Sequence, residues 1–287
     1  AWNADGKGPS IWDDFAHRSG TVMRGETGDV ACDHYNRFRE DVALMAKLGL
    51  QTYRLSISWP RIQPKGSGEV NEAGIAFYNA LIDELLKHNI EPLLTLYHWD
   101  LPLALEQEFG GFQSRKLIPA FAQYAKICFE RFGDRVKSWL TFNEPWCICV
   151  HGYCTGMHAP GRTSKAGTEP YKAAHHLLLA HAETVQLYRT EFQAAQGGRI
   201  GITLNTEFWE PASDDPRDVA VAEQALEFNL GWFADPVFLT GDYPESMKKA
   251  VGSRLPRFTP EESAMLKGSS DFFGLNHYST HVVGPMN

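Results

Sequence analysis

The stretch Thr141–Trp146, TFNEPW, places one carboxylate between an amide side chain and a proline, at the end of a predicted strand, Ser138–Glu144. A residue that precedes proline is biased toward extended backbone. Glu144 is therefore predicted to end the strand and not to begin a helix. A carboxyl group at the end of a buried strand, next to Asn143, is suited to general acid chemistry.

Sugar chemistry suits these residue types. Glycoside hydrolysis needs one carboxyl group as general acid and a second as nucleophile at about 5–5.5 Å, or as base to a water at roughly 6.5–9.5 Å. Trp99 and Trp146 offer rings that stack on pyranose faces. Glu144 would be the acid, and Asn143 would bind a sugar 2-hydroxyl. The alternative is a structural carboxylate that caps the next helix or pairs with an arginine such as Arg54.

Short β-branched or aromatic runs alternate with amphipathic helical stretches along the chain. The predicted strands are Thr52–Trp59, Pro92–Trp99, Ser138–Glu144, Ile200–Asn205 and Asp271–Tyr278. Helices are predicted between an Asp33 cap and a Gly49 stop, after an Asn71 cap, and over residues 115–132, 171–192, 219–239 and 260–267. Strands that alternate with helices indicate parallel pairing.

Two architectures satisfy this alternation, the doubly wound sheet and the (β/α)8 barrel. A nucleotide-binding wound sheet should carry a glycine-rich turn, but GxGxxG and GxxxxGK[ST] are both absent. Polar and aromatic residues follow the strands instead, in SISWPR, LYHWDLP, TFNEPW, ITLNTE and LNHYST, as at the catalytic face of a barrel. We therefore expect an α/β fold, a (β/α)8 TIM barrel that is incomplete because about five of its eight strands are visible.

Composition and sequence patterns indicate which classes of partner and which cellular location to expect. The 27 Lys and Arg against 35 Asp and Glu give a net charge of −8 with no basic run, which argues against a nucleic-acid partner. The apolar runs are strand-sized, so no membrane span is expected. The start AWNADGKGPS lacks the features of a signal peptide, and the five cysteines form no disulfide framework. A cytoplasmic location is expected.

Seven segments, in this order, resemble glycoside hydrolase family 1, with the closest likeness to fungal, intracellular β-glucosidases. They are GPSIWDDF, DHYNRFREDVALMAKLGLQTYRLSISWPRI, LYHWDLP, GGF, TFNEPW, HAPG and GLNHYST. Any one of them is a weak signal, but seven in register over essentially all 287 residues are specific. The resemblance implies a (β/α)8 barrel that retains anomeric configuration.

The resemblance also assigns roles to the matching positions. Glu144 matches the general acid/base, and Asn143 matches the residue that binds the 2-hydroxyl. Arg54 matches the arginine that steadies the charge of the nucleophile, and Tyr278 matches the tyrosine that hydrogen-bonds the nucleophile. The other matches bind substrate: His98 and Trp99 in the glycone site, Asn276 beside Tyr278, and Asn205, Glu207 and Trp146 as lining of the outer, aglycone part of the cleft.

Three family features do not occur in this sequence. The nucleophile of the family is a glutamate in an [IV]-T-E-N-G motif, and no TENG is present. The Q-x-E-G segment and the late E-W pair that bind the sugar are absent as well. Strand 1 and strands 7 and 8 of the family therefore lie outside the sequence. Residues 1–287 are expected to form a single barrel domain, truncated at both ends.

The resemblance implies a retaining β-glucosidase that hydrolyses terminal non-reducing β-D-glucosyl residues of cellobiose, short cello-oligosaccharides or aryl β-glucosides. Cellulose degradation is the expected setting, and no cofactor or metal is needed. The alternatives are a catalytically dead fragment and a non-catalytic sugar-binding derivative without the nucleophile. The 287-residue chain alone is predicted to be inactive, and the missing C-terminal portion of the barrel is an expected partner.

Several other polar residues have simpler explanations. Asp100 is predicted to cap the next helix, and Glu207 is favoured as cleft lining over a role as the inverting partner of Glu144. Cys147, Cys149, His151 and Cys154 cluster without the second ligand pair of a zinc site, so loop or core thiols are expected. His175, His176 and His181 lie on one predicted helix without HExxH and are expected to be hydrogen-bonded.

Overall fold

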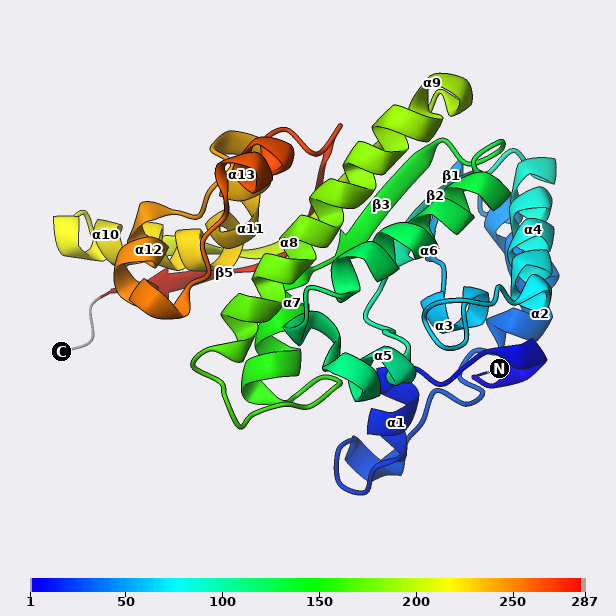
Figure 1. The fold of residues 1–287 in the computed structure, drawn as a ribbon, viewed down its shortest axis with the longest axis horizontal. Helices are drawn as coiled ribbons and strands as arrows, with labels where there is room; N and C mark the ends of the chain where they lie inside the picture. Colours follow the sequence, from blue (N-terminus) through cyan, green and yellow to red (C-terminus); the bar gives the residue numbers. More distant parts are fainter. Residues whose placement is uncertain (1, 285–287) are drawn as a thin grey trace.

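The computed structural model describes residues 2–284 and contains one parallel sheet of five strands (Figure 1). The strands are β1 (Thr52–Ser56), β2 (Glu91–Tyr97), β3 (Ser138–Asn143), β4 (Arg199–Pro211) and β5 (Phe273–Val283). They lie in the sheet in chain order, each parallel to the next. This order is that of a barrel wall, because a doubly wound sheet reverses its strand order at a switch point. The five predicted strands and their parallel pairing are confirmed.

Helices connect the strands and pack outside the sheet (Figure 1). The longer ones are α2 (His34–Lys47), α4 (Glu72–Lys87), α6 (Leu117–Phe132), α8 (Glu169–Leu187) and α10 (Pro216–Leu226). The short ones are α1 (Ile11–His17), α3 (Trp59–Ile62), α5 (Leu103–Phe109), α7 (Pro145–Val150), α9 (Gln193–Gln196), α11 (Trp232–Ala234), α12 (Glu245–Val251) and α13 (Pro260–Leu266).

The predicted helix over residues 219–239 is interrupted in the structure. After α10, two π-helical turns, Glu227–Gly231 and Asp235–Leu239, flank the single α-helical turn α11. Pro236 lies in the second of them and has no N–H to donate within an α-helix. The segment still contributes to the core, since Trp232 and Phe233 are buried.

Of the predicted helix ends, the Gly49 stop is confirmed, whereas the Asn71 and Asp33 side chains do not cap their helices. Gly49 has a φ of +76° directly after α2, as expected of a left-handed stop. Asn71 is the N-cap residue of α4, but its side chain accepts no hydrogen bond from the helix. Its amide instead donates to the backbone carbonyls of Asp5, at 2.8 Å, and Arg61, at 3.0 Å. Asp33, before α2, likewise makes no side-chain cap.

The core lies between the sheet and helices α6 and α8, which cross in front of β2 and β3 in Figure 1. All six residues of β3 are buried, as in a central strand of a parallel sheet. Phe142 of β3 stacks on Phe121 of α6 with ring centroids 4.4 Å apart, and Trp139 meets Phe129 edge-on at 5.0 Å. Each such side chain contributes roughly 1.5–3 kcal/mol by burial. The most firmly packed strand is thus the one that leads to Glu144.

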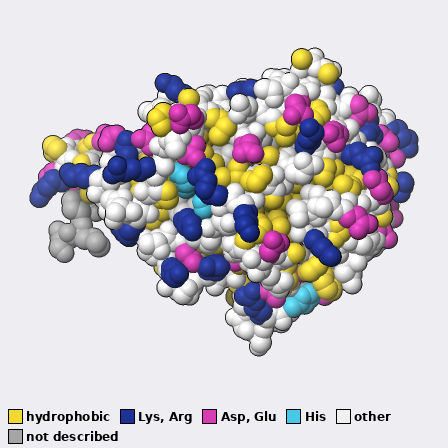
Figure 2. Space-filling model, viewed as in Figure 1, with side chains coloured by type: hydrophobic (Ala, Val, Ile, Leu, Met, Phe, Trp, Pro, Cys, Tyr) yellow, Lys and Arg dark blue, Asp and Glu magenta, His cyan; other side chains and the backbone are white. Residues whose placement is uncertain are grey.

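Strand β5 is far less covered. Among the described residues its side chains Phe273, Leu275, Tyr278 and Val282 are 47%, 48%, 68% and 68% exposed. The end of the molecule that carries α10 and β5 extends away from the body in Figure 1 and forms a narrower arm in Figure 2. An uncovered strand with exposed apolar side chains is a site for pairing or aggregation.

Neither a membrane-spanning helix nor a metal-binding cluster occurs among residues 2–284. Between residues 2 and 284 no helix has the length and apolar character to cross a membrane. Within the same range, no group of three His, Cys, Asp or Glu side chains is arranged to hold a metal ion.

Candidate active site

Glu144 lies at the junction of β3 and α7, and its backbone differs from the prediction. β3 ends at Asn143, and Glu144 is the N-cap residue of α7, with φ 53° and ψ 67°. The expectation of an extended residue that does not begin a helix is therefore wrong. Pro145 takes the first helical position, where its missing N–H costs nothing. The Glu144 N–H donates to the carbonyl of Thr203 at 2.9 Å, which fixes the peptide against β4.

This left-handed conformation is unusual for a residue with a side chain and costs on the order of 1–3 kcal/mol. Trp99, which follows β2, also has a positive φ, of 80°. Both residues belong to the same group of polar and aromatic side chains at the carboxyl ends of the strands. Backbone strain of this kind concentrates at functional sites, where the surrounding structure imposes it.

The side chain of Glu144 is buried, with 4% exposure, and receives two hydrogen bonds from β5. The Asn276 amide and the Tyr278 hydroxyl each donate to its Oε1 at 2.7 Å. The hydrogen bond to Glu144 raises the pKa of Tyr278 to about 12, so the hydroxyl remains a donor at ordinary pH. The resemblance led us to expect Tyr278 to bond to a second glutamate. Within the described residues it bonds to Glu144 instead.

Asn143 is the centre of a second polar group. Its Oδ1 accepts from Arg54 Nη2 and, at 3.3 Å, from Asn276 Nδ2. Its Nδ2 lies 3.1 Å from His98 Nε2, which must accept if the amide donates. Desolvation of the ring and the nearby Arg54 charge lower the pKa of His98, which favours this neutral acceptor. The predicted residues Arg54, His98, Asn143 and Asn276 are thus brought together.

Neither structural explanation for Glu144 is seen. Its side chain makes no cap to α7. The Arg54 guanidinium donates to the amide oxygens of Asn143 and, at 3.4 Å, Asn276 rather than to the carboxylate. The carboxylate is therefore held by two neutral donors, Asn276 and Tyr278, and not by a salt bridge within the described residues.

Aromatic and imidazole rings line the neighbouring surface. The Trp99 indole donates to the Asn143 carbonyl at 2.9 Å, and its ring lies 5.0 Å from that of His158. Trp146 meets His151 edge-on at 5.3 Å, and His151 lies 4.7 Å from His158. Sequence reasoning gave no role to His151 or His158. The only signal was the HAPG segment, which contains His158 but says nothing about its neighbours.

Among the described residues, neither Glu207 nor Asn205 of β4 makes a side-chain hydrogen bond to Glu144. The Glu207 carboxylate accepts from the backbone N and the hydroxyl of Ser279 at 2.8 and 2.6 Å, and His281 lies 3.7 Å away. The hydrogen bonds from Ser279 lower the pKa of Glu207, which weakens it as a base. This argues against an inverting pair with Glu144. Asn205 pairs with Asn276 in the sheet, and its buried Oδ1 has no partner among the described residues.

The three histidines of α8 are hydrogen-bonded, as expected, whereas the Cys147 thiol lies beside Glu144, and burial together with that carboxylate raises the pKa of the thiol. All five cysteines are free, and burial raises the pKa of Cys149 far above the range of a reactive thiol. The three histidines of α8 are buried and bonded to the Tyr243 hydroxyl (3.0 Å), the Phe112 carbonyl (2.7 Å) and the Thr141 hydroxyl (2.7 Å), in the order His175, His176 and His181.

Asp100 does not cap the next helix, contrary to the prediction. The N-cap residue of α5 is Pro102, with no side-chain cap. One carboxyl oxygen of Asp100, Oδ1, is buried without a hydrogen-bond partner among the described residues. Burial raises the pKa of Asp100 from 3.8 to about 7. The carboxyl group is thus protonated in the folded chain under mildly acidic conditions.

Replacing Asp100 with asparagine should change how stability depends on pH. Between about pH 4 and about pH 7 the folded chain keeps a proton that the unfolded chain releases, so wild-type stability falls as pH rises. The slope approaches about 1.4 kcal/mol per pH unit. The Asp100→Asn variant lacks this loss and should gain stability relative to wild type toward about pH 8. Urea unfolding across this range measures it, with the exposed Asp214→Asn variant as control. A pH-independent difference would contradict the assignment.

Known proteins match this chain over nearly its whole length. The family model described as Glycosyl hydrolase family 1 matches residues 1–287. Beta-glucosidase 42 of Arabidopsis thaliana is 52% identical over 284 residues, which are 98% of this chain and 58% of that protein. Beta-glucosidase 1B of Phanerodontia chrysosporium is 52% identical over 293 residues, 98% of this chain and 54% of that protein.

Solved structures of β-glucosidases also superpose closely on this chain. The β-glucosidase from Trichoderma harzianum superposes with a TM-score of 0.95 at 48% identity, covering 98% of this chain and 60% of that one. A mutant of the rice β-glucosidase Os3BGlu6, in a covalent complex with Glc, superposes with a TM-score of 0.97 at 49% identity, covering 99% and 61%. The chain therefore spans less than two thirds of the length of these relatives. The five strands correspond to part of a (β/α)8 barrel.

Proposed function

The chain belongs to glycosyl hydrolase family 1, and from its site we propose that the protein acts as a retaining β-glucosidase with Glu144 as general acid/base. The substrates would carry a terminal non-reducing β-D-glucosyl residue, as in cellobiose, short cello-oligosaccharides and aryl β-glucosides. The observation that carries the proposal is the buried Glu144 carboxylate. It is held by Asn276 and Tyr278 beside the Asn143 group.

In this mechanism Glu144 first protonates the glycosidic oxygen as the bond to the leaving group breaks. It then removes a proton from the water that hydrolyses the glycosyl-enzyme. The second carboxylate, the nucleophile, is supplied by the [IV]-T-E-N-G motif that the 287-residue sequence does not contain. That the rice relative has been solved in a covalent complex with Glc supports a covalent intermediate here.

The neighbouring side chains would position the sugar. Asn143 would bind the 2-hydroxyl, with His98 beside it in the glycone site, while Arg54 and Tyr278 would stabilise the nucleophile. Tyr278 and Asn276 hold Glu144 in the structure, so they would exchange partners when the second carboxylate is present. Trp99 would stack on the glucosyl ring, and Trp146, Asn205 and Glu207 would line the aglycone side. A cytoplasmic location remains a prediction.

Stereochemistry tests the proposal directly. A chimera in which residues 1–287 replace the matching segment of the Phanerodontia chrysosporium relative supplies the rest of the barrel. We expect it to release glucose initially as the β-anomer from an aryl β-glucoside, because double displacement retains configuration. Proton NMR during the first turnovers measures the anomer. Initial α-glucose would contradict the mechanism, and failure to hydrolyse any β-glucoside would contradict the function.

A further inference from the structure

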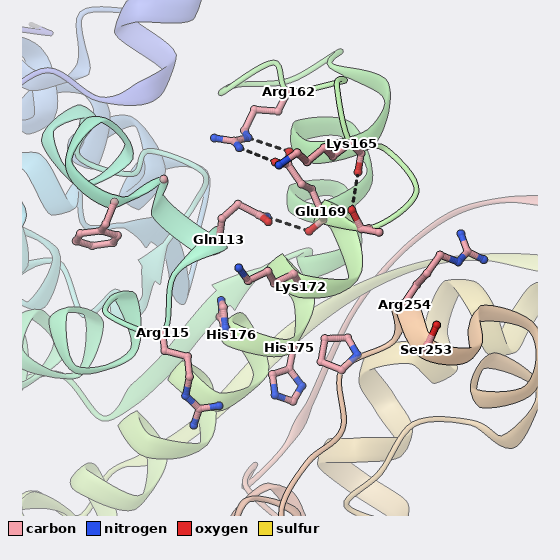
Figure 3. Close-up of a pocket in the computed structure, with 14 residues that line it drawn as sticks. Gln113, Arg115, Arg162, Lys165, Glu169, Lys172, His175, His176, Ser253 and Arg254 are labelled. Atoms are coloured by element: carbon pink, nitrogen blue, oxygen red, sulfur yellow. Dashed lines mark hydrogen bonds and ion pairs between the residues drawn. The ribbon is translucent and has the colours of Figure 1, made fainter.

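A pocket of about 730 Å³ is lined by residues outside the Glu144 group, among them the residues of the loop that leads into α8 (Figure 3). Three parts of the chain form its walls: the segment after α5, the first turns of α8 with the loop before it, and the turn after α12. It shares no lining residue with the polar group around Glu144. Its volume is in the range of small-molecule sites, about 300–1,000 Å³.

Five cationic side chains line this pocket, and carboxylates neutralise only two of them. Arg162 pairs with Glu169 at 2.6 Å and with Glu106 at 3.1 Å. Arg115 pairs with Glu262 at 2.5 Å. These pairs fix the two guanidinium groups in place on the wall formed by α8 and the segment before α6.

The other three cations form no salt bridge among the described residues, and the two lysines lie near Glu169, whose pKa is lowered first by its hydrogen bonds from Arg162 and then also by the Lys165 and Lys172 charges. Arg254 donates only to the carbonyls of Gly167, at 3.2 Å, and Val251, at 3.3 Å. The side-chain amines of Lys165 and Lys172 have no described hydrogen bond or ion pair. Figure 3 places Arg115 and Arg254 on opposite walls with Lys172 between them. In a chain of net charge −8, this is a local surplus of positive charge around a cavity.

The other residues that line the pocket suit an organic anion, one with a carbon skeleton beside its charged group. Phe109 and Pro256 contribute apolar surface to the walls. The buried rings of His175 and His176 bond through Nδ1 to Tyr243 and Phe112, which leaves the Nε2 atoms out of these bonds. Both rings are kept neutral, because burial lowers their pKa, to about 4 for His175. His176 donates through Nδ1 to the Phe112 carbonyl, so its neutral ring presents Nε2 as an acceptor for a hydroxyl group beside the charged part of a ligand.

From this arrangement we propose that the pocket between α8, the segment after α5 and the turn after α12 binds a small organic phosphate. Lys165, Lys172 and Arg254 would contact the phosphate oxygens. Arginine and lysine are the usual phosphate ligands, and charge-assisted hydrogen bonds are about twice as strong as neutral ones. The volume is too large for one inorganic phosphate to fill, so a ligand with a carbon skeleton or a second phosphate fits better.

Isothermal titration calorimetry on the protein tests this, with pyrophosphate, glucose 6-phosphate, inorganic phosphate, sulfate and glucose as the probes. We expect pyrophosphate and glucose 6-phosphate to bind more tightly than inorganic phosphate or sulfate, and glucose not to bind at this pocket. Binding should weaken as salt is raised, since exposed charges are screened. The readout needs no turnover, so it stands or falls independently of the β-glucosidase proposal.

Charge reversal locates the site. Lys172→Glu should weaken glucose 6-phosphate binding by at least about tenfold, since a hydrogen bond to a charged group is lost. Lys47→Glu, an equal charge change at the far end of α2, is the matched control and should change affinity less than about twofold. Circular dichroism confirms that both variants fold. Equal weakening by both substitutions would show only non-specific attraction, and no binding by either phosphorylated probe would overturn the proposal.

Discussion

Replacing Glu144 with glutamine in the chimera should lower kcat/KM for cellobiose by about 10²–10⁴-fold, the range that general acid–base catalysis contributes. Glutamine keeps the shape of the side chain and an oxygen that accepts from Asn276 and Tyr278, so the fold should be preserved. What it loses is the transferable proton. Initial rates of glucose release by the parent and variant chimeras measure the effect.

The dependence on the leaving group separates a catalytic role from a structural one. A dinitrophenolate leaves without protonation, whereas the alcohol leaving group of cellobiose needs a proton. The Glu144→Gln variant should therefore lose much more rate for bond cleavage with cellobiose than with a dinitrophenyl β-glucoside, measured as the burst of released phenolate. Glu223→Gln is the matched control, because this glutamate is exposed on α10, outside the groups assigned to substrate or catalysis. Equal losses for both substrates would indicate that Glu144 is structural.

Much of the fold was predictable, because parallel strands buried on both faces and amphipathic helices leave strong local patterns. All five strands start within two residues of their predicted positions, although β4 and β5 run six and five residues further, to Pro211 and Val283. The extra residues pair with each other in the sheet. Their length depends on this pairing between segments some 70 residues apart, which no local pattern records.

Part of the site was predictable for the same reason. Residues at the carboxyl ends of parallel strands meet at one edge of the sheet, so Asn143 and His98 could be placed together from sequence. Arg54 and Asn276 lie within β1 and β5, and only the family resemblance placed them at this site. The conformation of Glu144 could not be predicted. The proline rule indicated an extended residue, but the hydrogen bond from its N–H to Thr203 of β4 and the start of α7 at Pro145 select a left-handed one. Tertiary contacts override the local preference here.

The pocket between α8, the segment after α5 and the turn after α12 could not be predicted from the sequence either. Arg115, Lys172 and Arg254 are scattered over 140 residues of sequence, and no window of the chain contains a basic run. Only the packing of three separate segments gathers them around one cavity. The overall negative charge said nothing about a local surplus of positive charge. Charge patterns that come from tertiary structure have no signature in composition.

The 287-residue chain, purified by itself, is expected to hydrolyse an aryl β-glucoside at least about 10³-fold more slowly than the chimera, because catalytic groups that act as a unit fail together. A retaining mechanism needs a second carboxylate about 5–5.5 Å from the acid/base. Among the described residues, Glu207 of β4 is the candidate for this second carboxylate. It is bound to Ser279, and that hydrogen bond lowers its pKa.

Folding must be checked separately from activity, since exposed Leu275 and Val282 on β5 favour aggregation of the isolated chain. Size-exclusion chromatography and circular dichroism establish whether a folded monomer is present, and the assay is then run on that fraction. The chimera, treated in the same way, controls for losses during purification. A folded 287-residue chain with turnover near that of the chimera, abolished by Glu144→Gln, would mean that Glu144 works with a carboxylate inside this sequence. The nucleophile assigned to the [IV]-T-E-N-G motif would then be dispensable. No turnover by the folded chain, with activity in the chimera, would place the second carboxylate outside it.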